Sequence, residues 1–137
     1  MRVRCVGGIV RDGSGRLLLV KRGRPPGEGL WSIPGGRVEP GEDDAAAVAR
    51  ELREETGLDV AVGALVGTVD RPGPGEVTYE IHDYAAAVTG GALRAGDDAA
   101  EARWAAPDEV RALPTSPGLV DALTSWNVLP RGAVNGA

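Results

Sequence analysis

The pattern of hydrophobic and polar residues predicts β-strands in the first part of the chain. Residues 2–10 alternate and then become apolar, and residues 17–20 are apolar throughout, as in a strand covered on both faces. Turn-forming residues at 12–15 separate the two segments, so we expect them to form a hairpin. A glycine- and proline-rich loop at 23–29 precedes a short strand-like segment at 30–38, which a Pro-Gly-Gly sequence interrupts.

Residues 43–56 have the pattern of an amphipathic helix. Asp43 is expected to cap its N-terminus, and Gly57 is expected to end it in a left-handed conformation. Five residues recur at helical spacing and are expected to form one packing stripe: Ala45, Val48, Ala49, Leu52 and Thr56.

The second half of the chain predicts further strands and two short helices. We expect strands at 58–69, 77–82 and 101–105, separated by loops at 70–75 and 90–98. The helices are expected at 107–113 and 119–126, and residues 131–137 as a flexible tail. With no repeat and no second domain, residues 1–130 are expected to form one layered domain of the α/β class, in which a mixed sheet packs against helices.

Composition narrows the functional classes. A chain of 137 residues, 42% hydrophobic, suits a single domain with a useful core. The formal net charge of -5 argues against a general nucleic-acid binder, although a bound cation could still recruit a phosphate-bearing ligand. Cys5 is the only cysteine, and the sequence has no secretory pattern and no apolar stretch long enough to span a membrane. A cytoplasmic protein is therefore the expectation.

One face of the predicted helix gathers carboxylates. Glu51, Glu54 and Glu55 fall within an arc of roughly 100° at helical spacing. Glu51 and Glu55 are four residues apart, so their charges repel unless a divalent cation offsets the repulsion. Carboxylate oxygens suit Mg²⁺ or Mn²⁺. Arg50 stands four residues before Glu54 and can pair with it.

A helix face rich in Glu and Arg is usually a solvated surface, but the spacing here favours another interpretation. A random match to seven fixed identities is on the order of 10⁻⁸ per starting point. The pattern resembles the Nudix box, and the Trp31-Ser32-Ile33-Pro34-Gly35 segment before it also resembles this family. The matching positions are Gly36, Glu42, Arg50, Glu51, Glu54, Glu55 and Gly57, followed by Leu58.

This resemblance to the Nudix hydrolase family, and to its MutT-like members, implies an α/β/α sandwich and a pyrophosphohydrolase. Such enzymes cleave a nucleoside diphosphate linked to a group X by attack of water at phosphorus. By position, Glu51, Glu54 and Glu55 would bind Mg²⁺ or Mn²⁺ together with a backbone carbonyl at Gly36 or the glycine before it. Arg50 would orient one of the carboxylates. Many relatives are dimers, so a homodimer is left open.

The general base is left open, because the family varies it. Glu51 is one candidate. The loop before Trp104 offers three more carboxylates by position, which are Asp97, Asp98 and Glu101.

The expected partner is a nucleotide. Arg22 and Arg24 could contact its phosphates, against the alternative of a solvated loop, and Trp31 could stack on its base, against the alternative of a core residue. Pro74 stands sixteen residues beyond the box, as in some relatives that cleave ADP-ribose. ADP-ribose or a related nucleoside diphosphate sugar is therefore the favoured substrate. The alternatives are a nucleoside triphosphate and a non-catalytic nucleotide-binding module.

Overall fold

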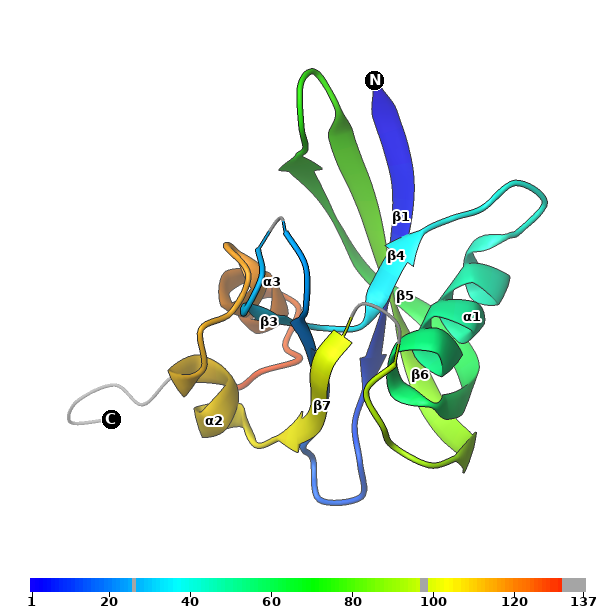
Figure 1. The fold of residues 1–137 in the computed structure, drawn as a ribbon. Coiled ribbons are helices and arrows are strands. Elements are labelled where there is room, and N and C mark those ends of the chain that lie inside the picture. The colour runs from blue at the N-terminus through cyan, green and yellow to red at the C-terminus, as the bar shows by residue number, and fades with distance from the viewer. Residues whose placement is uncertain (26, 97–98, 132–137) are drawn as a thin grey trace.

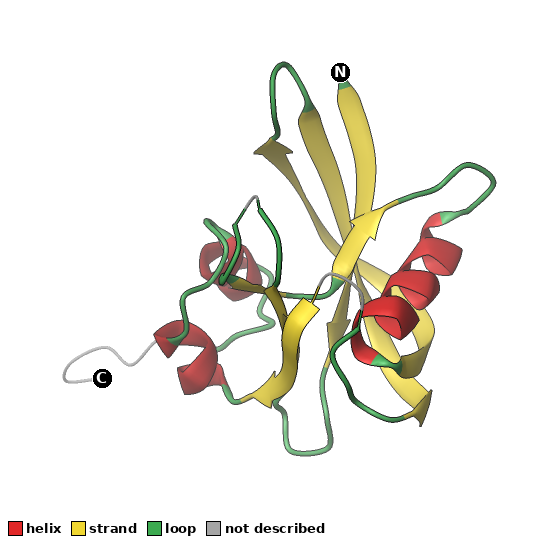
Figure 2. Ribbon diagram, in the orientation of Figure 1, coloured by secondary structure: helices red, strands yellow, loops and turns green. Residues whose placement is uncertain are grey.

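The computed structural model describes residues 1–25, 27–96 and 99–131. Seven strands and three helices follow one another in the described residues, and α1 is the longest helix (Figures 1 and 2). In chain order they are β1 (Arg2–Val10), β2 (Leu17–Arg22), β3 (Trp31–Ser32), β4 (Gly35–Arg37), α1 (Asp44–Thr56), β5 (Leu58–Pro72), β6 (Thr78–Gly91), β7 (Ala99–Ala105), α2 (Pro107–Ala112) and α3 (Leu119–Ser125).

The strands form two sheets between layers of helix. The four-stranded sheet has the order β4-β1-β6-β5 and is mixed, since β1 and β6 are parallel. The three-stranded sheet has the order β3-β2-β7 and is antiparallel. Figure 1 shows α1 on one side of the strands and α2 and α3 on the other. The expected α/β class, with mixed sheet between helices, is confirmed.

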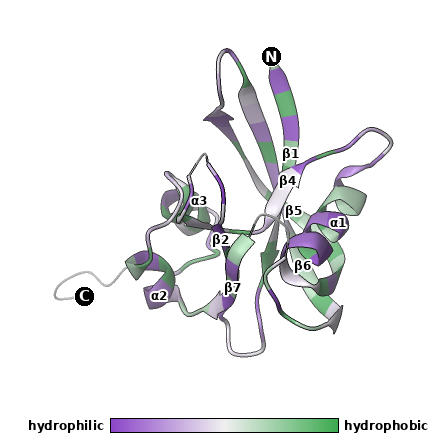
Figure 3. Ribbon diagram, viewed as in Figure 1, coloured by the Kyte–Doolittle hydropathy of each residue, from purple (hydrophilic) through white to green (hydrophobic). Residues whose placement is uncertain are grey.

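Each face of β2 packs into a different core, which explains its unbroken apolar run. Leu18 packs with Val48 and Leu52 of α1, whereas Leu19 packs with Val110 of α2 and Leu123 of α3. All six side chains are fully buried. The contrast with β1 is visible in Figure 3, where the start of β1 alternates hydrophilic and hydrophobic residues.

The helix α1 begins and ends as the sequence predicts. The Asp43 carboxylate accepts a hydrogen bond from the Ala46 amide at 2.8 Å, and Gly57 has a φ of 74° and donates its amide to the Arg53 carbonyl. The packing stripe differs by one position. Ala47 is fully buried and Ala45 is exposed, because the helix turns its 47–48 edge rather than Ala45 toward the sheet.

The expected hairpin of the first two strands is wrong. The strands β1 and β2 lie in different sheets, and a single bridge between Arg11 and Leu17 joins the chain beside their turn. Both edges of β1 are already occupied, by β4 and by β6, so no edge is left for β2. The expected strand-like segment at 30–38 also divides between sheets, with β3 in one and β4 in the other.

The strands β5 and β6 are longer than the sequence predicts. Their pairing runs from Leu58 with Gly91 to Pro72 with Thr78, so the expected loops at 70–75 and 90–98 both begin within strands. Irregularities near residues 59–67 absorb the glycines of β5 without ending it. Pro72 is tolerated because β5 is an edge strand. The expected helices α2 and α3 are confirmed, and no helix in the described part of the chain is long and apolar enough to cross a membrane.

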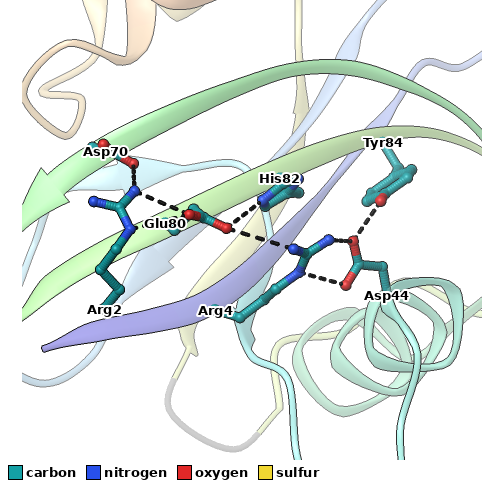
Figure 4. A network of polar contacts seen from close by, with 7 residues as sticks. All are labelled: Arg2, Arg4, Asp44, Asp70, Glu80, His82 and Tyr84. Atoms are coloured by element: carbon teal, nitrogen blue, oxygen red, sulfur yellow. Dashed lines mark hydrogen bonds and ion pairs between the residues drawn. The ribbon is translucent and has the colours of Figure 1, made fainter.

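A polar network fastens the first turn of α1 to the four-stranded sheet (Figure 4). Arg4 of β1 binds both carboxylate oxygens of Asp44, at 2.6 and 3.0 Å, and Tyr84 of β6 donates its hydroxyl to the same carboxylate. Glu80 accepts a second contact from Arg4 at 3.5 Å and lies 2.9 Å from the His82 ring. These contacts fix the angle at which α1 crosses the sheet.

Candidate active site

The carboxylates of α1 meet the backbone of β4. The Gly35 amide donates to Oε2 of Glu55 at 3.2 Å. Gly36 faces Glu51, and a Cβ built on it would lie 2.5 Å from Oε1 of that carboxylate. Glycine at this position therefore lets the Glu51 carboxylate rest directly against the backbone.

Arg50 is the centre of the acidic cluster. Its Nε and Nη2 donate to the two oxygens of Glu42, at 2.7 and 2.9 Å. Its Nη1 reaches Glu51 at 2.9 Å and Glu54 at 3.2 Å, and Nη2 also binds the Arg37 carbonyl at 3.0 Å. The hydrogen bonds to Glu42 raise the pKa of Arg50 and lower the pKa of Glu42. One guanidinium thus joins the loop before α1, the helix and β4.

Glu51 and Glu55 form a coupled pair. Burial, followed by the negative charge of Glu51, raises the pKa of Glu55 to about 8, against the Gly35 amide and the charge of Arg22. Burial also raises the pKa of Glu51, although Arg50 opposes the shift. Glu55 therefore holds a proton near neutral pH, beside the carboxyl group of Glu51. A cation placed between them would take over the role of that proton.

The pair fits a hard divalent ion such as Mg²⁺ or Mn²⁺, because its two carboxyl groups offer oxygen ligands. Glu54 is the most exposed of the three glutamates. Its side chain is 42% exposed and is held by Arg50. Accordingly, no group of three acid, histidine or cysteine side chains within the described residues is arranged to hold a metal ion. An ion bound by all three glutamates would require Glu54 to turn away from Arg50.

Among the other candidates for the general base, the structure describes only Glu101, which is not brought to this pair. Asp97 and Asp98 lie outside the described residues. Glu101 lies on β7, with its side chain 60% exposed and 3.8 Å from the Lys21 ammonium. Glu101 pairs with Lys21, on the face of the sheet that Leu19 turns toward α2 and α3. That face is opposite α1.

The predicted substrate-binding residues have different positions. Arg22 ends β2 close enough to Glu55 for its charge to lower the pKa of that carboxyl group. Arg24 is exposed in the loop after β2. Trp31 is only 5% exposed and belongs to the core, with the Arg103 guanidinium 5.9 Å from its ring centroid. Packing therefore occupies most of the Trp31 ring.

Asp83 is a residue that sequence reasoning missed. It lies on β6, is 5% exposed, and its Oδ1 has no hydrogen-bond partner among the described residues. Burial raises its pKa to about 6. A buried oxygen without a partner costs roughly 1–3 kcal/mol. The available signal was the position of Asp83, two residues after Ile81 and four after Tyr79. At this position the alternation of the strand predicts an apolar side chain.

Comparison with known proteins shows the family of this chain. The NUDIX domain model matches residues 1–126. The chain belongs to the NUDIX domain family. The matched span holds the acidic cluster of α1, the glycines of β4 and the core of both sheets. This NUDIX domain also has the fold of the MutT protein from Methanosarcina mazei Go1, with a TM-score of 0.81 and 25% identity, covering 92% of this chain and 93% of that one.

Curated relatives of this NUDIX domain carry different names. It is 41% identical over 100 residues to a putative 8-oxo-dGTP diphosphatase of Bacillus subtilis, covering 72% of this chain and 63% of the relative. It is 42% identical over 102 residues to an ADP-ribose pyrophosphatase of Methanocaldococcus jannaschii, covering 72% and 59%. It is 34% identical over 122 residues to the CTP pyrophosphohydrolase of Escherichia coli, covering 88% and 87%. The matches thus span about three fifths of the first two relatives, and the names of all three relatives denote hydrolysis of a phosphate anhydride.

Proposed function

We propose that this protein is a metal-dependent pyrophosphohydrolase that cleaves a nucleoside diphosphate linked to a group X. The observation that carries the proposal is the Glu51–Glu55 pair, in which the charge of Glu51 raises the pKa of Glu55 and both carboxyl groups lie against the backbone of Gly35 and Gly36. Two neighbouring carboxylates that are partly withdrawn from water repel each other unless a cation offsets their charge. The Nudix box places them beside an arginine that keeps one of them in position.

Each residue has a defined part in the proposed reaction. A bound divalent ion would neutralise the diphosphate and lower the pKa of a water molecule. Glu51 and Glu55 would hold that ion, and Arg50 keeps Glu51 in position through a hydrogen bond to its carboxylate. Arg22, whose charge reaches Glu55, attracts the substrate phosphates. The proton of the attacking water would go to a carboxylate, for which Glu51 is one candidate and Asp98, by its place in the sequence, is the alternative.

The first candidate substrate is ADP-ribose or another nucleoside diphosphate sugar. The spacing of Pro74 after the box supports it, as does the similarity to the archaeal ADP-ribose pyrophosphatase. A nucleoside triphosphate is the second candidate. It is favoured by the CTP pyrophosphohydrolase of Escherichia coli, which this chain matches over 87% of its length.

The deciding experiment is product analysis after incubation with Mg²⁺ or with Mn²⁺. The panel holds ADP-ribose, other nucleoside diphosphate sugars, and the common and oxidised nucleoside triphosphates. AMP and ribose phosphate from ADP-ribose would support the first candidate, and a nucleoside monophosphate with pyrophosphate would support the second. Nucleotide binding without turnover in either metal would contradict the proposal and favour a non-catalytic binding module.

A further inference from the structure

The Asp83 carboxyl group is the one acid in the described part of the chain that is buried within a sheet and has an oxygen without a partner. The neighbouring backbone leaves room for it. A Cβ on Gly7, its partner on β1, would lie 2.2 Å from Oδ1. Its partner on β5 is also a glycine, Gly67, and the Trp126 ring lies against that residue. Two strands therefore omit side chains around this carboxyl group.

Asp83 is at one end of a row of side chains on the sheet, and Tyr79, Arg37 and Arg71 are at the other end. Because side chains of a strand alternate, Tyr79 and Asp83 share one face of β6. This face is opposite α1, since Gly7 opposes Asp83, whereas a Cβ on the next residue, Gly8, would meet Leu52 of α1.

The other end of the row carries positive charge. The Arg37 guanidinium lies 5.6 Å from the centroid of the Tyr79 ring and donates to its hydroxyl at 3.3 Å. Arg71 is paired with Tyr79 in the sheet, and its charge reaches Asp83. Within the described residues, neither arginine has an ion pair with a carboxylate. Arg37 directly follows Gly36, so this row starts beside the backbone that touches Glu51.

We propose that Asp83 is a specificity-determining residue that accepts a hydrogen bond from the exocyclic amino group of the substrate's nucleobase. This inference rests on the proposed function, which requires the substrate to be a nucleotide. A carboxylate accepts hydrogen bonds and does not donate them, so it selects a donor. Adenine, cytosine and guanine present an amino group, whereas uracil and hypoxanthine lack one. Tyr79 and the two arginines supply an aromatic surface and positive charge along the same face.

The test compares nucleotides that differ only in the amino group. We would measure kcat/KM for GTP against ITP and for CTP against UTP at about pH 8, where Asp83 is ionised. Binding of GMP against IMP, and of CMP against UMP, would be measured by calorimetry as a readout independent of turnover. The variants are Asp83→Ala and Asp83→Asn. The matched control is Asp70→Asn, an exposed carboxylate of the same strand pair that binds Arg2.

The wild-type protein should prefer the amino-bearing member of each pair by at least roughly tenfold, since a site built for a donor rejects the analogue without it. Asp83→Ala should reduce the preference to within about threefold, and Asp83→Asn, which keeps a neutral acceptor, should retain part of it. The control should match the wild type. The inference would be overturned if Asp83→Ala kept the wild-type preference for the amino-bearing nucleotide. If the alanine variant does not fold, an undiminished preference in Asp83→Asn would overturn it instead.

Failure of the proposed function gives a different result. A protein that hydrolyses nucleotides without discriminating amino groups keeps the proposed function and loses only this inference. A protein that binds an amino-bearing mononucleotide selectively but hydrolyses none keeps the inference on nucleotide recognition and loses the proposed reaction. Absence of both binding and turnover overturns both.

Discussion

Arg50 holds Glu42 with both prongs of its guanidinium, at 2.7 and 2.9 Å, across eight residues of sequence. The third nitrogen of the same group binds Glu51 at 2.9 Å. The loop before α1 and the proposed metal ligand are therefore fixed by one planar group. A planar fork performs this task better than a point charge, because it fixes directions as well as distances.

Replacing Arg50 with lysine should lower kcat/KM by about 10–100-fold, because an ammonium group cannot reproduce the fork and the carboxylate of Glu51 loses its support. Steady-state kinetics at saturating Mg²⁺ would measure the effect. The matched control is Arg53→Lys on the same helix, whose 73% exposed side chain pairs only with Asp59 among the described residues. Equal activity in both variants would show that Arg50 does not position the site.

Glu55→Gln should keep the fold and lose activity. Without metal, Glu55 with its pKa of about 8 is already mostly neutral at pH 7, so an amide of the same shape costs little stability. The amide is a poor ligand for Mg²⁺, so the rise in Tm on adding Mg²⁺ should disappear together with turnover. The exposed Asp121→Asn variant on α3 serves as the control. A normal Tm rise in Glu55→Gln would argue against Glu55 as a metal ligand.

Gly36→Ala should damage the site through a single methyl group. The new Cβ would lie 2.5 Å from Oε1 of Glu51, closer than real contacts allow, so the carboxylate must move. The expected result is weaker Mg²⁺ activation and lower kcat. Gly13→Ala, at a turn where a Cβ meets nothing within 4 Å, provides the comparison. Unchanged metal activation in Gly36→Ala would mean that Glu51 does not act from its present position.

The sequence was sufficient for features that depend on local chemistry. The capped helix from Asp44 to Thr56 follows from an N-cap, an apolar stripe and a terminal glycine, all of which act within a few residues. The contact between Arg50 and Glu54 follows from helical spacing alone. The resemblance to the Nudix box predicted the acidic cluster, because the spacing of the box positions matches the geometry of α1.

Features that depend on distant partners could not be predicted. The division of β1 and β2 between two sheets is decided by β6, which occupies an edge of β1 from seventy residues away. The sharing of one Arg50 nitrogen by Glu51 and Glu54 depends on side-chain conformations, which a helical projection does not include. Burial of Asp83 depends on Gly7 and Gly67, which lie far away in sequence.

Asp83 should make the protein less stable as pH rises from about 4 to about 7, relative to an Asp83→Asn variant. Burial raises the pKa of this carboxyl group from 3.8 to about 6, so the folded state holds its proton more tightly than the unfolded state. The contribution of this proton to the free energy of unfolding is complete at pH values below the pKa of the unfolded state. It is lost as pH rises through the pKa of the folded state. The shift corresponds to roughly 3 kcal/mol.

Urea unfolding of both proteins across this pH range would measure the difference in unfolding free energy. The wild type should lose stability against Asp83→Asn by up to roughly 3 kcal/mol between pH 4 and pH 7, and the difference should level off at higher pH. Other carboxylates titrate in both proteins and cancel in the comparison. Asp70→Asn should instead follow the wild type, because its parent carboxylate is exposed and shows no comparable burial. A constant difference between Asp83→Asn and wild type at every pH would mean that this buried carboxyl group titrates as it does in water.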